Sequence, residues 1–229
     1  MEFYDNLADM VKGEKARLSS ISDLPETGVV LAVYEQGDNS NSKTSFMNRK
    51  VSQLEIDVQG IINDRHRRYS HERTGRERTL YPKGVSLREN RHWFAISPYD
   101  AELCSQQMGV EITPEMLGAN FLIGAEDNRS FSLSKVPRGT YIVIAPSDSL
   151  EAPKPPIATL VVYAKQLPCV YTGNPISEFY GRRELAGRFV EKTKENRGIV
   201  GTIEYPVAEP AIIKPGLKVF FKFPKGIES

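Results

Sequence analysis

The sequence predicts a mainly β protein, built as a closed or nearly closed β-barrel with a few peripheral helices. Eight short apolar segments are distributed along the chain, and several of them alternate apolar with polar residues, as strands with one buried face do. Clusters of Gly, Pro, Asn and Asp separate these segments, whereas parallel βαβ units would place a helix between successive strands. This arrangement favours a barrel over a doubly wound sheet.

A short helix is expected before the barrel. Apolar residues near the N-terminus recur at spacings of three, four and seven, on one stripe of a helix: Phe3, Leu7, Met10, Val11 and Leu18. Pro25 is expected to end this helix. We therefore divide the chain into a helical extension at residues 1–27 and a barrel domain at residues 28–229.

The strands are expected where β-branched and aromatic residues are concentrated. In chain order they span residues 29–34, 51–58, 92–97, 130–136, 140–145, 157–164, 198–205 and 217–223. A stretch with four prolines, residues 146–156, interrupts the series and is typical of an extended connection. The segments before it would leave an open sheet with exposed edges, so we expect the segments after it to close the same barrel.

Two helices are expected outside the barrel. Residues 98–109 follow Ser97, a good N-cap residue, and begin with proline, which the first helical position tolerates. Residues 178–193 place Phe179, Leu185 and Phe189 at helical spacing.

Composition and missing motifs exclude several function classes. The chain has 229 residues, 40% hydrophobic and 26% charged, which is ordinary globular composition. Its net charge of +1 gives no overall attraction to nucleic acid or to an anionic membrane. The Walker A, GxGxxG, HExxH and GxSxG patterns are absent. These absences argue against P-loop nucleotidases, Rossmann oxidoreductases, zincins and lipase-type hydrolases.

The sequence is that expected of a cytoplasmic protein. Its two cysteines, Cys104 and Cys169, form neither a disulfide framework nor a CxxC motif. The N-terminal segment lacks the basic and apolar regions of a secretory signal. The longest apolar stretch, residues 157–164, is far shorter than the roughly 20 residues that cross a bilayer, so we expect no membrane partner.

An arginine-rich segment at residues 64–93 is the most unusual part of the sequence. It contains nine Arg and Lys residues against four Asp and Glu residues. Converging arginines can hold a phosphate or carboxylate. Alternatively, the segment is a solvated loop paired with its own acidic residues. A third interpretation, nucleic-acid binding with Tyr69, Tyr81 and Trp93 as stacking platforms, is disfavoured by the overall charge balance.

Cysteine and histidine offer the other candidate chemistry. All three histidines, His66, His71 and His92, lie in the arginine-rich segment, but their spacing is not that of a compact zinc motif. Cys169 follows a predicted strand, where its thiolate would suit nucleophilic chemistry or a soft metal. Simple packing is the alternative for Cys169 and the expected role of Cys104.

Five short motifs follow one another along the chain: residues 60–66 (GIINDRH), 117–121 (LGANF), 168–171 (PCVY), 197–199 (RGI) and 213–219 (IKPGLKV). In order and spacing they resemble a MOSC domain, named for the C-terminal part of molybdenum cofactor sulfurase. The resemblance extends over roughly residues 28–223, and the stand-alone bacterial members of that family also begin directly with the barrel.

The resemblance implies a barrel whose cleft accepts the molybdenum cofactor, a pterin carrying a dithiolene and a phosphate. Cys169 matches the family cysteine, which either ligates molybdenum or carries sulfur as a persulfide. The same resemblance assigns cofactor contacts to Asp64, Arg65, His66, Arg68, Asn120 and Arg197. Stand-alone relatives reduce small N-hydroxylated compounds with electrons from separate flavin or iron–sulfur proteins, so an external electron donor is the implied partner.

Two departures from the family pattern leave alternatives open. Ala119 replaces the glutamate of the family's Leu-Gly-Glu-Asn, which removes a carboxylate that could hold the cofactor or deliver a proton. Leu217 replaces the aspartate of a later Gly-Asp. The alternatives to a molybdenum-dependent oxidoreductase are a sulfur carrier or cofactor-handling protein without small-substrate turnover, and a non-catalytic barrel that binds a partner through its arginine-rich loop.

Overall fold

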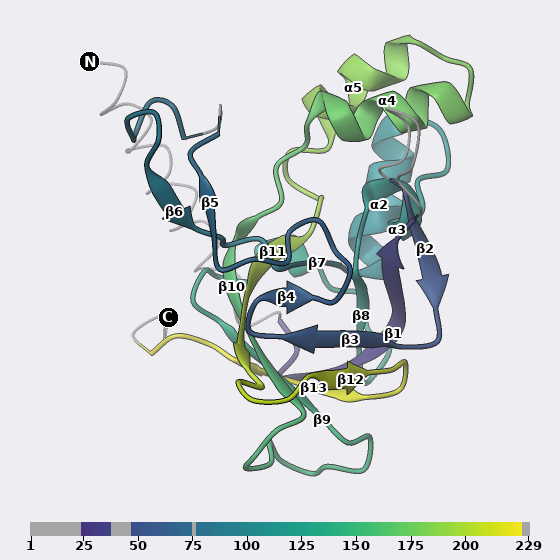
Figure 1. Ribbon diagram of the computed structural model, residues 1–229. Coiled ribbons are helices and arrows are strands. Elements are labelled where there is room, and N and C mark those ends of the chain that lie inside the picture. The colour runs from purple at the N-terminus through teal and green to yellow at the C-terminus, as the bar shows by residue number, and fades with distance from the viewer. Residues whose placement is uncertain (1–23, 38–46, 75–76, 226–229) are drawn as a thin grey trace.

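The computed structural model describes residues 24–37, 47–74 and 77–225 (Figure 1). The helix expected in the N-terminal extension falls on residues 1–23 and lies outside the described residues. Among the described residues, no helix is both long and apolar enough to span a membrane.

Seven strands close into a barrel. In chain order they are β1 (Thr27–Gln36), β7 (Trp93–Ile96), β8 (Phe121–Ala125), β9 (Tyr141–Ala145), β10 (Ala158–Lys165), β11 (Ile199–Tyr205) and β13 (Lys218–Lys222). Around the barrel the order is β1-β13-β9-β10-β11-β7-β8, and β8 pairs with β1 to complete the ring. The sheet is mixed, because β7 and β8 run parallel while the other pairs run antiparallel. The prediction of a mainly β, closed barrel is confirmed.

Strands on both sides of the proline-rich connection belong to this one sheet. Residues 146–156 join β9 to β10, which are antiparallel neighbours. Interior side chains of both groups meet in one apolar core, for example Val30 from the first half and Leu160 from the second.

The remaining strands form additions to the barrel. β2 (Asn48–Val51) extends the sheet beside β1, and β3 (Leu54–Asp57) pairs with β4 (Gly60–Ile61) and β12 (Ala211–Ile213). The single strand expected at residues 51–58 is thus divided between two sheets. β5 (Ser70–Glu72) and β6 (Ser86–Arg88) form a hairpin that projects from the barrel, here called the arm (Figure 1).

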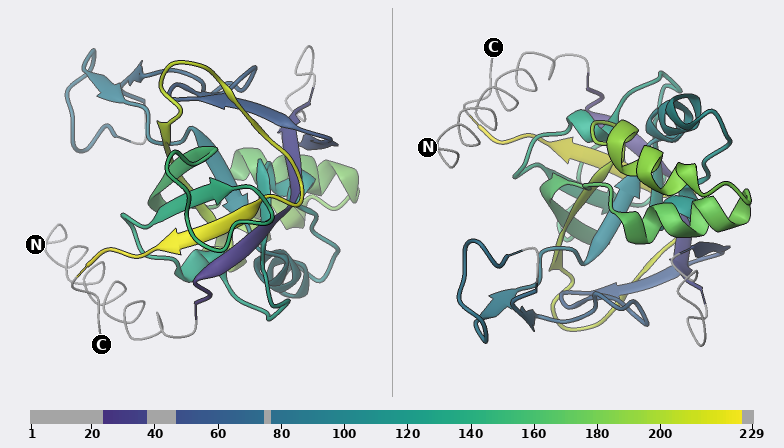
Figure 2. Two further views of the ribbon diagram at one scale, coloured as in Figure 1. Left: turned by 90° about the horizontal axis from the view of Figure 1, so that it is seen from below. Right: turned by 90° about the horizontal axis from the view of Figure 1, so that it is seen from above.

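Four helices lie together at one end of the barrel (Figures 1 and 2): α2 (Pro98–Met108), α3 (Pro114–Leu117), α4 (Val170–Phe179) and α5 (Glu184–Lys192). The prediction for α2 is confirmed: Ser97 Oγ accepts a hydrogen bond from the Asp100 amide, and Gly109 ends the helix in the left-handed region. The helix expected at residues 178–193 begins six residues later, because Gly181 (φ 62°) separates α4 from α5.

The strand expected at residues 130–136 is wrong. Residues Leu133–Lys135 form a 3₁₀ turn instead. The buried carboxylate of Asp100 accepts hydrogen bonds from the Ser132 hydroxyl (2.5 Å) and the Ser134 amide (3.1 Å), while Ser134 Oγ accepts one from the Gly198 amide (2.7 Å). The Ser134 amide is therefore bonded to a side chain, whereas in a strand it would pair with a neighbouring strand. The barrel strand that was missed, β8, is a five-residue apolar segment beginning at the end of the LGANF motif.

Candidate functional site

The loop after β4 forms one wall of the candidate site. Asp64 Oδ1 accepts a hydrogen bond from the His66 amide (2.8 Å), which makes a tight turn. The Arg65 amide donates to Gln36 Oε1 at the end of β1 (3.0 Å), so the turn is fixed to the barrel. Asn63 precedes it with φ 67°, a conformation that asparagine tolerates.

Cys169 stands at the N-cap of α4, opposite this loop. Its carbonyl oxygen accepts hydrogen bonds from the amides of Thr172 (3.1 Å) and Gly173 (3.2 Å), which begin the helix. The side chain is half-buried, and Sγ lies 3.5 Å from Thr172 Oγ1. The positive end of the ten-residue helix α4 favours the thiolate form of a sulfur at this position.

Asn120 braces the site from the start of β8. Its Oδ1 accepts from the Phe94 amide (2.9 Å), and its Nδ2 lies 3.4 Å from Asp64 Oδ2 and 3.5 Å from the Tyr34 carbonyl oxygen. Both ends of the amide are therefore engaged within the protein. Asn120 holds the Asp64 turn against β1 and β7, and its amide is already hydrogen-bonded within the protein.

Arg197 is buried, with 2% of its surface exposed, and ties together three segments. Nη1 donates to the Leu167 carbonyl (2.6 Å), and Nη2 donates to the Leu117 carbonyl (3.1 Å) and to Thr172 Oγ1 (2.8 Å). The guanidinium also lies over the ring of Phe189, 5.3 Å from its centroid. The segments before Asn120 and before Cys169 are thus held to the same cation.

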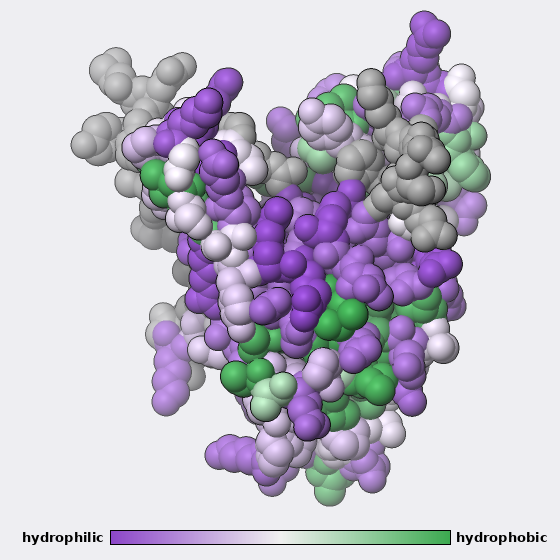
Figure 3. Space-filling model, viewed as in Figure 1, coloured by the Kyte–Doolittle hydropathy of each residue, from purple (hydrophilic) through white to green (hydrophobic). Residues whose placement is uncertain are grey.

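These elements enclose a cavity of about 180 Å³. Six of the seven predicted site residues line it: Asp64, Arg65, His66, Asn120, Cys169 and Arg197. An open surface cleft shares Asp64 and Arg65 with the cavity, so the two spaces adjoin. Hydrophilic residues cover the surface between the arm and the helices (Figure 3).

Arg68 is the predicted site residue that does not line the cavity. Its Nε donates to Glu89 Oε2 (3.0 Å), a carboxylate with 2% of its residue surface exposed. His71 Nδ1 lies 3.4 Å and His66 Nδ1 3.9 Å from the same oxygen. Burial raises the pKa of Glu89, but the nearby His66, Arg68 and His71 side chains outweigh it and lower the pKa to about 2.

His92, the third histidine, is buried away from the cavity lining. Its Nδ1 accepts from the Ile203 amide (3.3 Å), so Nε2 carries the hydrogen and donates to the Arg68 carbonyl (3.2 Å). Burial lowers the pKa of His92. Within residues 24–37, 47–74 and 77–225, no cluster of three His, Cys, Asp or Glu side chains is arranged to hold a metal ion.

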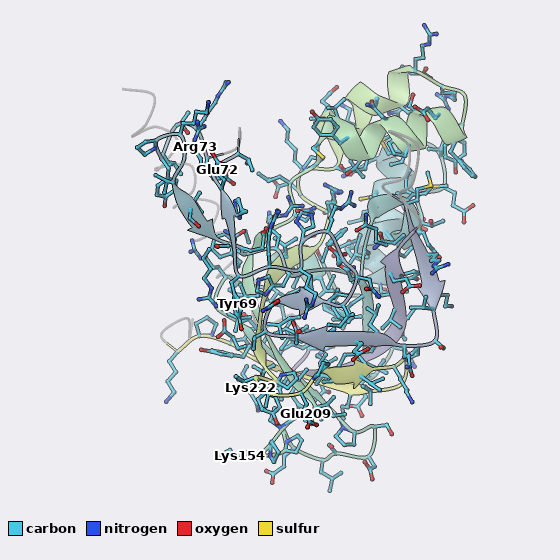
Figure 4. The ribbon with its side chains drawn as sticks, in the orientation of Figure 1. Tyr69, Glu72, Arg73, Lys154, Glu209 and Lys222 are labelled. Carbon is cyan, nitrogen blue, oxygen red and sulfur yellow. The ribbon has the colours of Figure 1, made fainter. Side chains whose placement is uncertain are left out.

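Much of the remaining arginine-rich segment is paired on the surface. Arg67 contacts Asp57 (2.5 Å), and Arg88 contacts Glu204 (3.0 Å). Glu72 and Arg73 lie on the arm, and Tyr69 lies where the arm leaves the barrel (Figure 4). The solvated, paired arrangement considered from sequence describes Arg67 and Arg88. Among the described residues of the segment, only those at its two ends line the cavity.

Sequence reasoning missed other lining residues: Asn48, Arg91, Gln166, Tyr171 and Thr172. Arg91 stood within the arginine-rich segment, and its Nε is buried with no hydrogen-bond partner among the described residues. Thr172 carried no local signal, because its contact is with Arg197, twenty-five positions along the chain. Burial lowers the pKa of Arg65, while the charges of Asp64 and Cys169 oppose that effect.

The comparisons with known proteins concern the fold. No protein-family model matches the chain, and no curated protein matches it. Among solved structures, the YuaD protein from Bacillus subtilis superposes with a TM-score of 0.68 at 23% sequence identity, covering 86% of this chain and 97% of that one. A protein described as hypothetical gives a TM-score of 0.48 at 13% identity, covering 86% of this chain and 70% of that one. The chain therefore has the fold of the YuaD protein.

Proposed function

We propose that the chain is a MOSC-type protein that binds the molybdenum cofactor through Cys169. The observation that carries this proposal is that residues from separate motifs meet at one cavity. Cys169, the Asp64–His66 turn and Arg197 come from three of the separate motifs that resemble the family, and all three line one cavity. The thiolate would ligate the metal, since a soft ligand suits molybdenum.

The residues present suit the cofactor chemically. Three guanidinium groups, of Arg65, Arg91 and Arg197, line the cavity with one carboxylate, Asp64, which favours an anionic group such as the pterin phosphate. The buried Arg91 Nε offers a donor that has no partner among the described residues. The cavity is smaller than the roughly 300–1,000 Å³ of typical cofactor sites, so the cofactor would extend into the adjoining cleft beside Arg65.

The proposed reaction is reduction of an N-hydroxylated compound. Two electrons and two protons convert the N–OH group to N–H and water. When bound, molybdenum supplies the two-electron redox change. The chain has two cysteines, half of the four that hold an all-cysteine iron–sulfur cluster, so the electrons would come from a separate flavin or iron–sulfur protein.

His66 would supply the proton that the missing glutamate cannot. Ala119 is fully buried, and its carbonyl accepts a hydrogen bond from Asn48 Nδ2 (2.8 Å). His66 lines the cavity, and its buried Nδ1 faces Glu89. A ring oriented in this way by a buried carboxylate would exchange a proton through Nε2, the nitrogen on its other edge.

The test is metal and pterin analysis of protein produced in a host that makes the cofactor. The intact chain and Cys104→Ala should retain molybdenum, whereas Cys169→Ser should lose it with thermal stability changed by no more than about 1 kcal/mol. Absence of molybdenum and pterin from the intact chain, or equal retention by Cys169→Ser, would reject the proposal. An intact mass that reveals an extra sulfur on Cys169 instead would favour the sulfur-carrier alternative.

A further inference from the structure

A second cavity, here called the arm cavity, lies between the arm and the outer face of the barrel. The arm projects on the side of the barrel away from the helices (Figures 1 and 2). The volume of the arm cavity is about 480 Å³, within the roughly 300–1,000 Å³ of typical small-molecule sites. It shares no lining residue with the cavity beside Cys169. The lining residues used below are Leu80, Tyr81, Leu87, Arg138, Val161 and Tyr163.

The barrel wall of the arm cavity is formed by β10 and β11. Along β10, Leu160 is buried in the core, so its neighbour Val161 and the next alternate residue, Tyr163, face outward. β11 pairs with β10 and adds Thr202 and Glu204 to the lining. Tyr163 has 38% of its surface exposed, so an aromatic ring is accessible on this wall.

The arm supplies the opposite wall, and it is partly apolar. His71 on β5 pairs with Leu87 on β6, and both are partly buried while their neighbours along each strand are exposed. The segment between the two strands adds Leu80 and Tyr81, which are 62% and 44% exposed. Large apolar side chains that line a concave surface favour an apolar part in the ligand.

Contacts within the chain hold the arm beside the barrel. At the base of the arm, the buried Glu89 carboxylate accepts a hydrogen bond from Arg68 Nε (3.0 Å) and lies 3.4 Å from His71 Nδ1. Along β6, Arg88 Nη2 lies 3.0 Å from Glu204 Oε1 on β11. The two walls are therefore connected by the protein itself, and the arm cavity is preformed.

Arg138 is a fixed cation at the edge of the arm cavity. Its guanidinium lies over the Tyr163 ring, 4.6 Å from the centroid. The next residue, Gly139, takes φ 83°, which glycine adopts without strain, and its amide donates to the Val162 carbonyl (2.8 Å). Among the described residues, no carboxylate forms an ion pair with Arg138, so its guanidinium can bind an external anion.

The other charged groups that line the arm cavity lie beside groups of opposite sign. Arg88 contacts Glu204 (3.0 Å), and His71 Nε2 lies 3.8 Å from Glu77 Oε1. Arg138 is thus the described lining cation available to a ligand. A guanidinium binds a carboxylate through two parallel hydrogen bonds, and tyrosine rings pack well against another aromatic ring. The lining therefore favours a ligand with one carboxylate and an aromatic group.

We propose that the arm cavity binds a small aromatic carboxylate. The carboxylate pairs with Arg138, and the ring packs between Tyr163 of the barrel and the Leu80 and Tyr81 side chains of the arm. This site requires neither the molybdenum cofactor nor Cys169, so the proposal can be tested in cofactor-free protein and does not depend on the proposed function.

The experiment measures the binding of phenylacetate and naphthylacetate to the full chain by isothermal titration calorimetry. Naphthylacetate should bind more tightly, because its second ring buries more apolar surface. The corresponding amides keep the rings but lose the charge, and they should bind at least about tenfold more weakly. Equal binding of a carboxylate and its amide, or no binding of either carboxylate at millimolar concentration, would overturn the proposal.

Variants of Arg138 test the assigned partner of the carboxylate. Arg138→Gln should weaken the binding of naphthylacetate about tenfold, whereas Arg138→Lys should retain part of the affinity, because it keeps a positive charge without the planar fork. Arg182→Gln is the matched control. Arg182 is another exposed arginine, between α4 and α5, and contacts Glu184 (2.8 Å), so its replacement should leave the affinity unchanged. An unchanged affinity in Arg138→Gln would overturn the proposal.

Arg65→Gln distinguishes the two cavities. Arg65 lines the cavity beside Cys169 and is absent from the lining of the arm cavity. Naphthylacetate should therefore bind Arg65→Gln as tightly as the intact chain. An affinity lowered in Arg65→Gln to the same extent as in Arg138→Gln would place the carboxylate beside Cys169 and overturn the assignment to the arm cavity.

Discussion

The cavity and the arm are both rich in arginine, yet they use it in opposite ways. In the cavity, Arg197 is buried and bonded to two carbonyls and a hydroxyl from separate segments. On the arm, Arg88 has 69% of its side chain exposed and contacts the half-exposed Glu204. A buried cation with several bonds organises its surroundings, whereas an exposed ion pair is screened by solvent. The number of arginines in a segment therefore does not locate a site; what distinguishes Arg197 is its burial and its bonds to several segments.

The largest effect is expected from removing the cation that organises the cavity. Arg197→Gln leaves the Leu117 and Leu167 carbonyls and the Thr172 hydroxyl without their charged donor. We expect the free energy of unfolding to fall by about 3 kcal/mol, because each buried group left unsatisfied is costly. Urea denaturation measures the change, and a loss under about 1 kcal/mol would show that Arg197 does not organise these segments.

Glu89 should make the protein sensitive to acid. Its pKa is lowered to about 2 in the folded protein and returns to about 4.5 on unfolding, so its stabilising contribution is complete above pH 4.5. As the pH falls from 4.5 toward 2, up to about 3 kcal/mol should be lost. Comparing urea midpoints at pH 6 and pH 3 measures this.

Glu89→Gln should remove most of that pH dependence, and Glu204→Gln serves as the exposed control. Glu204 contacts Arg88 at the surface, so its replacement should leave the acid sensitivity in place. Equal slopes of stability against pH in the intact chain and in Glu89→Gln would contradict the assignment of the acid sensitivity to Glu89.

A smaller loss is expected at the turn that carries Arg65. Asp64→Ala removes the acceptor of the His66 amide and the contact with Asn120 Nδ2. We expect a loss of about 1–2 kcal/mol in the free energy of unfolding, typical of losing a side-chain acceptor that fixes a turn. Asp64→Asn, which keeps Oδ1 as an acceptor, should recover part of it.

The smallest effect is expected at the arm. Arg88→Gln breaks the exposed ion pair with Glu204, and the free energy of unfolding should change by less than about 0.5 kcal/mol. Measured beside Arg197→Gln, it gives the contrast between the two regions directly. A loss comparable with that of Arg197→Gln would remove the distinction drawn between them.

Most barrel strands were predictable because their signal is local. β9 and β10 combine β-branched residues with flanking turn residues, and both lie within a residue or two of the predicted bounds. The failure at residues 130–136 has the opposite origin. Its serines bond to Asp100, a partner more than thirty positions away, and no local pattern reveals such a contact.

The residues of the candidate site also divide into those that a sequence motif indicated and those whose role depends on distant contacts. Cys169, Arg65 and His66 were found because their motifs resemble a family, and the structure brings them to one cavity. Thr172 and Glu89 were missed because their importance lies in contacts: Thr172 with an arginine twenty-five positions away, and Glu89 with Arg68 and two histidines. Arg68 was assigned to the cavity, but it is directed to Glu89 instead.

By itself, the sequence determined that this chain forms a mainly β barrel with helices added, since alternation and turn residues act over a few positions. It also determined which residue types were available for chemistry, above all two cysteines and a run of arginines. Only the tertiary structure decided which arginine is buried, which carboxylate holds the histidines and which hydroxyl faces the sulfur. Burial and hydrogen bonding depend on segments that meet in space, and that meeting exists only once the barrel has closed.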